Sequence, residues 1–155
     1  MPTAEALSHL VDDATVVYIL ETHRHFEDLR QVASQLAALL VLSAAGSRES
    51  TLDHPMLIAA AQLHRDATDG LRRARPTLRA RRHNEHVLAA ASHLADALSA
   101  ANRVINSDDI DPILIPLRAG YAALREAANA LPGFELISFE RACCGIHLPN
   151  EVKPA

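Results

Sequence analysis

Aromatic residues are scarce in this sequence, where they make up 3% of the chain and tryptophan is absent. A β-sandwich is typically rich in aromatic and β-branched side chains. Here the 49% apolar content is mostly alanine and leucine, which favour helices packed at short range. The shortage of aromatics therefore predicts an all-α fold.

Glycine and cysteine are also few. The five glycines form neither a phosphate-binding glycine-rich loop nor a Gly-x-Ser-x-Gly turn. The two cysteines are adjacent, so they do not make a disulfide framework. These absences favour a protein that is not an enzyme. The amino terminus lacks a basic region followed by an apolar core, so we expect a cytoplasmic protein without a signal peptide.

The charge and the apolar runs argue against two classes of partner. A net charge of −4 gives no global attraction to nucleic acid, and we do not expect a nucleic-acid partner. The apolar run Leu36–Ala45 is far shorter than the roughly 20 residues that span a bilayer. We therefore expect no membrane partner, whereas a small-molecule ligand remains open.

The longest stretch without a glycine or proline runs from Thr3 to Ala45. Its apolar residues recur at helical spacing, Thr3 is placed to cap its start, and Gly46 to end it. One straight helix of this length would reach roughly 65 Å, longer than any later helix in the chain. We expect a bend or break at residues 22–26, with Thr22 as a second cap, slightly ahead of one continuous helix.

Prolines and glycines divide the rest of the chain into further helices. The pattern predicts helices at about 55–74, at about 77–105, and from a capping Asp111 and Pro112 to the Leu131-Pro132-Gly133 stop. Residues 133–155 are expected to pack over the bundle as a lid. The fold predicted for residues 1–155 is a single domain, an up-and-down bundle of four to five helices with this carboxy-terminal lid segment.

The run Leu36–Ala45 is apolar on nearly every side, which is typical of a helix buried on every side. Helices of the expected lengths cannot cover the whole Thr3–Ala45 stretch within one chain. The leading functional hypothesis is therefore a non-enzymatic binding or interaction module that self-associates through Leu36–Ala45, most simply as a homodimer.

A transition-metal or haem site in a redox or sensor bundle is the first alternative. Cys143, Cys144 and His147 offer thiolate and imidazole ligands, and Glu21 and His25 lie one helical turn apart on the long stretch. Such a site would need these groups to converge in space. The competing interpretation is that Cys143 fills the core face of a short helix and that Glu21 and His25 are half-solvated residues near a helix break.

Three histidines, His83, His86 and His93, lie on the predicted helix at 77–105. They would join a site if their face met Glu21 or His25. The more ordinary interpretation is a polar outer face, and a pH-responsive interface is a third, because histidine changes charge near neutral pH.

An arginine cluster marks the junction between the second and third predicted helices. Such a group can hold a phosphate-bearing ligand or a nucleic-acid backbone, but it lacks interleaved aromatics for base stacking. A solvated junction, partly neutralised by Asp108, Asp109 and Asp111, explains it equally well. The arginine cluster consists of Arg72, Arg73, Arg75, Arg79, Arg81 and Arg82.

Overall fold

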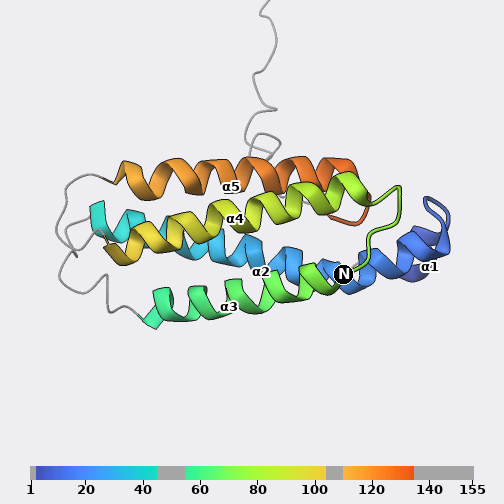
Figure 1. Cartoon of the computed structure of the whole chain (residues 1–155), viewed down its shortest axis with the longest axis horizontal. Coiled ribbons are helices and arrows are strands. Elements are labelled where there is room, and N and C mark those ends of the chain that lie inside the picture. Colours follow the sequence, from blue (N-terminus) through green and yellow to red (C-terminus); the bar gives the residue numbers. More distant parts are fainter. Residues whose placement is uncertain (1–2, 45–54, 104–109, 135–155) are drawn as a thin grey trace, which may run out of the picture.

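The computed structural model describes residues 3–44, 55–103 and 110–134. These residues form five helices and no strand, which confirms the all-α prediction. Figure 1 shows the four longer helices lying alongside one another and alternating in direction, as expected of an up-and-down bundle. The helices are α1 (Ala4–Ser8), α2 (Asp13–Ala44), α3 (Pro55–Arg73), α4 (Arg81–Arg103) and α5 (Asp111–Ala130). Of the expected lid at residues 133–155, only Gly133 and Phe134 lie within the described residues.

The break in the long amino-terminal stretch falls at residues 9–12, so the expected break at residues 22–26 is wrong. Asp12 caps α2, because its carboxylate accepts hydrogen bonds from the Thr15 amide at 2.9 Å and the Thr15 hydroxyl at 2.8 Å. Thr22 is no cap but a buried residue in the middle of α2, where its hydroxyl donates to the Tyr18 carbonyl at 2.7 Å. The unbroken α2 has 32 residues and is about 48 Å long.

The other helix ends follow local signals. Thr3 caps α1 as predicted, by accepting from the Ala6 amide at 3.3 Å. Pro55 begins α3, and Thr77 accepts from the Ala80 amide just before α4. Asp111 does not cap α5 as predicted, since it is the first residue of the helix and Ile110 precedes it without a side-chain cap.

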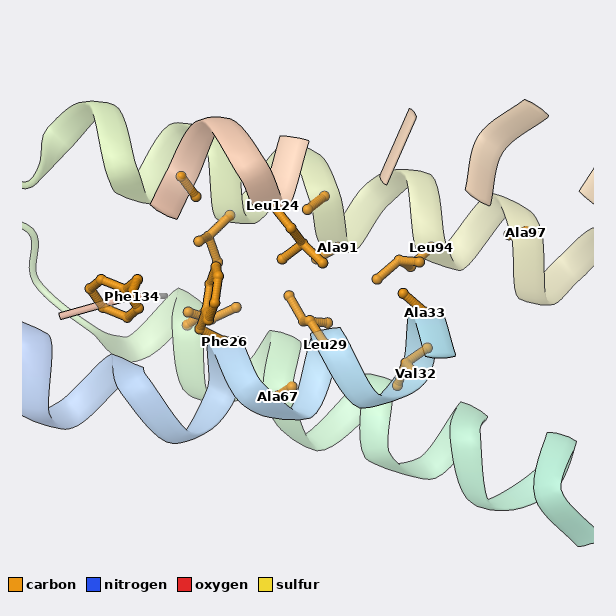
Figure 2. Packing of buried hydrophobic residues seen from close by; sticks show 14 of the residues in the cluster. Phe26, Leu29, Val32, Ala33, Ala67, Ala91, Leu94, Ala97, Leu124 and Phe134 are labelled. Carbon is orange, nitrogen blue, oxygen red and sulfur yellow. The ribbon is translucent and has the colours of Figure 1, made fainter. Parts of the chain in front are cut away.

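The predicted core faces are largely confirmed. Figure 2 shows side chains from α2, α4 and α5 meeting in this core, with Leu29, Leu94 and Leu124 among them. The expectation for Tyr121 is wrong, because its side chain is 42% exposed on the outer side of α5. The buried residues of α2 are Thr15, Val16, Tyr18, Ile19, Thr22, Phe26, Leu29, Val32, Ala33, Leu36 and Leu39.

α4 and α5 pack closely because small residues line their contact. A Cβ placed on Gly120 of α5 would lie only 3.1 Å from Leu94 Cγ and 3.5 Å from His93 Cβ of α4. The alanines Ala90 and Ala97 of α4 and Ala127 of α5 are also fully buried. The alanine-rich composition thus has the predicted effect, because α4 and α5 approach each other at short range.

The carboxy-terminal part of α2 is buried on only one side within this chain. Leu36 is 1% and Leu39 is 7% exposed, whereas Val41 is 68% and Leu42 is 39% exposed. One chain therefore does not cover this run on every side, and its burial by a second copy stays a prediction.

Replacing Leu94 by alanine should lower the free energy of unfolding by about 3 kcal/mol, because it removes a fully buried side chain between α4 and α5. Leu78→Ala is the matched control, since the Leu78 side chain is exposed, and should change it by less than about 0.5 kcal/mol. Urea unfolding of both variants measures the difference. Equal effects would contradict the packing described for Leu94.

Candidate functional site

His83 is the most distinctive ionisable residue in the described structure. It lies in the first turn of α4 and is fully buried, so the interpretation of a polar outer face is wrong for this histidine. Its spacing from Val87, Ala90 and Leu94 explains the burial, because these positions share one helical face. The sequence held this signal, since His83 continues the apolar stripe by one turn.

Burial decides the charge of His83. Removal from water disfavours the imidazolium, and the nearby His86 adds to the effect, so the pKa of His83 falls from 6.5 to about 4. The imidazole is therefore neutral near neutral pH. A base this weak is a poor acceptor of protons in catalysis, where a pKa close to the working pH is most effective.

Tyr18 of α2 is the hydrogen-bond partner of His83. The Tyr18 hydroxyl lies 2.9 Å from His83 Nδ1 and 3.3 Å from the Asn84 Oδ1 atom. When the hydroxyl donates to Asn84, Nδ1–H of His83 donates to the hydroxyl in turn. Burial raises the pKa of Tyr18, so the phenol also stays neutral. A neutral pair of this kind joins α2 to α4 without a buried charge.

Aromatic rings enclose the pair. The Phe134 ring lies over the His83 ring with centroids 4.0 Å apart. The same Phe134 ring also stacks on the His23 ring, with centroids 5.8 Å apart. Phe26 meets Phe134 edge to face at 5.1 Å, and Figure 2 shows these two phenylalanines close together. We call Tyr18, His23, Phe26, His83 and Phe134 the histidine–aromatic cluster.

Phe134 reaches the histidine–aromatic cluster because α5 ends just before it. Leu131 leaves the helix in an extended conformation, and Gly133 has a φ of 94°, which a residue with a side chain rarely adopts. The chain therefore turns back toward α2 and α4. The Leu131-Pro132-Gly133 stop predicted from the sequence is confirmed, but its role in placing an aromatic ring was not foreseen.

One polar atom in the histidine–aromatic cluster has no partner. His83 Nε2 is buried and makes no hydrogen bond to any of the described residues. An unsatisfied buried polar atom costs about 1–3 kcal/mol. The other ring nitrogen, Nδ1, is paired with the Tyr18 hydroxyl. Loss of that hydrogen bond would therefore leave both ring nitrogens unsatisfied.

The predicted metal ligands are not brought together in the described part of the chain. Glu21 is exposed, whereas His25 lies against Gly70 of α3, with its Nδ1 atom 3.9 Å from the Asp28 carboxylate. Residues 3–44, 55–103 and 110–134 hold no group of three or more histidine, cysteine or acidic residues suited to a metal ion. Cys143, Cys144 and His147 lie outside these ranges, so their metal or haem site stays a prediction.

The arginine cluster surrounds the connection between α3 and α4, and all its members are exposed. Figure 1 places this connection at one end of the bundle and the start of α5 at the other. Asp111 is therefore separated from the cluster by the length of α4, about 35 Å. The expected neutralisation of the arginines by Asp111 is wrong, and Asp108 and Asp109 lie outside the described residues.

Comparisons with protein families, curated proteins and solved structures find no match to this chain. None of the helices in the described ranges has the length and apolar character needed to cross a membrane. The functional argument therefore depends on the surfaces and buried groups of the bundle itself.

The depressed pKa of His83 predicts a pH-dependent stability. In the unfolded chain histidine binds a proton below about pH 6.5, whereas folded His83 binds one only below about pH 4. Because the unfolded state binds more protons between these values, the free energy of unfolding should fall by up to about 3 kcal/mol as the pH falls through this window. Urea unfolding across the window should show a shallower fall in the free energy of unfolding for His83→Gln than for the wild type. The control His93→Gln keeps His83, so the contribution of His83 to the fall should be unchanged. A fall as steep in His83→Gln as in the wild type would contradict the assignment.

Removing the Tyr18 hydroxyl should destabilise the bundle by about 1–3 kcal/mol, because Tyr18→Phe leaves His83 Nδ1 buried without a partner. Tyr121→Phe deletes the same atom from an exposed side chain and should change the free energy of unfolding by less than about 0.5 kcal/mol. Thermal and urea unfolding compare the two variants. Similar small effects from both would show that the buried hydrogen bond contributes little.

Proposed function

We propose that this protein is a non-enzymatic interaction module that pairs with a second copy of itself through the outer face of α2. The observation that carries the proposal is the absence of charge on this face. After Arg30, no residue up to the end of α2 at Ala44 is charged. The exposed residues, which we call the α2 outer face, are Gln31, Ser34, Ala37, Ala38, Val41 and Leu42.

A helix on the surface of a bundle ordinarily places charged and polar residues toward water. α3 and α4 follow this rule, since their outer sides carry residues such as Arg65, Asp69, Glu85 and Asp96. The α2 outer face departs from it for about three turns. Depletion of charge is the compositional feature that distinguishes the centre of a protein interface from the remaining surface.

A second copy suits this face better than a charged partner does. In a two-fold pair the same patch meets itself, so any charge near the axis would face a like charge. An uncharged face avoids that repulsion. Ala37 and Ala38 have small side chains, which would let two helices approach closely. Pairing would also bury the apolar surface of Val41 and Leu42 that is exposed to solvent in one chain.

The buried side of α2 supports the outer face. Leu36 and Leu39 are anchored in the core on the opposite side of the same turns. The alternating directions of the helices place the end of α2 near the start of α3 and of α5 (Figure 1), where Ile58 and Ile115 are also exposed.

Sedimentation equilibrium tests the proposal. We expect a dimer at micromolar concentration, and we expect Val41→Glu to weaken dimerisation at least tenfold, because a dimer would place two carboxylates together at its interface. Val17→Glu is the matched control, since Val17 is an exposed valine at the other end of the same helix. It should leave the association unchanged, and both variants should retain the helical content of the wild type.

A wild-type protein that remains monomeric at micromolar concentration would refute self-association. A dimer that Val41→Glu and Val17→Glu weaken equally would show that the α2 outer face is not the site of pairing.

A further inference from the structure

We propose that the end of the bundle formed by the α3–α4 connection docks on the surface of an anionic lipid bilayer, with the arginine cluster on the phosphates and Leu78 entering the interface. This surface is at the opposite end of the bundle from the end of α2, which carries Val41 and Leu42 (Figure 1), so the inference does not depend on self-association. The expectation of no membrane partner rested on the short apolar run Leu36–Ala45, which bears on spanning a bilayer and not on docking to its surface. We call the arginine cluster together with Leu78 the basic end.

The basic end is held in place by hydrogen bonds. The Thr77 hydroxyl lies 2.8 Å from the Thr15 hydroxyl of α2, and the Ala80 amide donates to the Thr77 carbonyl at 3.1 Å. The Ala74 amide donates to the Gly70 carbonyl at 3.2 Å, which extends α3 toward the connection. A surface fixed in this way loses less conformational entropy when it binds than a flexible loop would.

The charge of the basic end is of one sign along the chain. Residues 70–84 contain the whole arginine cluster and no acidic residue. Within the described ranges, no carboxylate forms an ion pair with any of these arginines. Two exposed carboxylates flank this stretch, Asp69 one helical turn before Arg73 and Glu85 one turn after Arg81. The pKa of Asp12 is lowered mainly by its hydrogen bonds to Thr15 and in smaller part by the charge of Arg79.

Helix electrostatics separates the arginines into two groups. Arg72 and Arg73 end α3, where a cation is favourable to the helix dipole, so they have a structural role. Arg81 and Arg82 begin α4, where a cation is unfavourable, and the first turn of α4 contains no acidic residue. At this helix start the peptide dipoles and the arginines add to the same positive potential, which an anionic phosphate would relieve.

Leu78 distinguishes a lipid surface from a nucleic acid. Its side chain is 80% exposed in the middle of the arginine cluster, and Leu10, in the bend before α2, is 56% exposed at the same end of the bundle. A nucleic-acid backbone offers nothing to an isolated leucine, and no exposed aromatic is present in residues 70–84 for stacking on bases. Cations that bind headgroups beside apolar side chains that enter the acyl boundary are typical of proteins that lie on a bilayer without spanning it.

Co-sedimentation with vesicles tests the inference on the full chain. We expect binding to vesicles that contain phosphatidylglycerol and none to vesicles of phosphatidylcholine alone, with binding that weakens as salt is added. The triple substitution Arg79→Gln, Arg81→Gln and Arg82→Gln should reduce the binding constant at least tenfold, given about fivefold for each arginine near the surface. Arg118→Gln with Arg125→Gln is the control, since both arginines are exposed on α5, and should reduce it less than twofold.

Leu78→Ser separates the lipid from other polyanions. It should reduce vesicle binding about tenfold, because the leucine no longer enters the interface, whereas Ile115→Ser, a matched change of an exposed residue on α5, should not. Circular dichroism confirms that each variant is folded.

Three results would overturn the proposal. The first is no binding to anionic vesicles at low salt, and the second is vesicle binding that Leu78→Ser and Ile115→Ser reduce equally. The third is binding to duplex DNA in place of vesicles, unchanged by Leu78→Ser, which would assign the arginine cluster to a nucleic-acid backbone.

Discussion

Burial of one continuous stripe along α2 is the constraint on which the other helices depend. The stripe runs from Thr15 to Leu39 and contacts each of the remaining long helices of the bundle, while α4 and α5 also pack closely against each other. α2 can contact all of them because it runs unbroken from Asp13 to Ala44 and is about 48 Å long. The cap at Asp12 places the break before α2 one turn ahead of Thr15, the first residue of the stripe, and the later polar segment Glu21–His25 continues as helix, with the Thr22 hydroxyl donating to the Tyr18 carbonyl of the preceding turn.

A buried polar pair links this stripe to α4 and makes the bundle sensitive to pH. Tyr18 and His83 are neutral, share a short hydrogen bond, and are covered by Phe26 and Phe134. The pair is sensitive to pH because protonation of His83 would bury a charge among aromatic rings. Its unsatisfied Nε2 atom costs stability, whereas burial of the Phe26 and Phe134 rings in the same histidine–aromatic cluster stabilises the packing of α2, α4 and the residues after α5.

The two ends of the bundle differ in chemistry for reasons that lie in the chain itself. At one end the α2 outer face lacks charge and presents Val41 and Leu42, and at the other the arginine cluster surrounds Leu78. Up-and-down topology creates this separation, because it places the end of α2 and the connection after α3 at opposite ends (Figure 1). A chain with a net charge of −4 thus carries a locally basic surface, which shows why net charge alone is a poor guide to partners.

The sequence by itself determined the fold class, most helix boundaries and most of the core, because proline, glycine and capping residues act locally and apolar spacing shows which face is buried. Thr3, Pro55 and the Leu131-Pro132-Gly133 stop acted as predicted. Tertiary structure decided the rest. It left Tyr121, Val41 and Leu42 exposed and made Tyr18 the hydrogen-bond partner of His83. Those outcomes depend on which helix packs against which, and partners far apart in the sequence leave no local pattern to read.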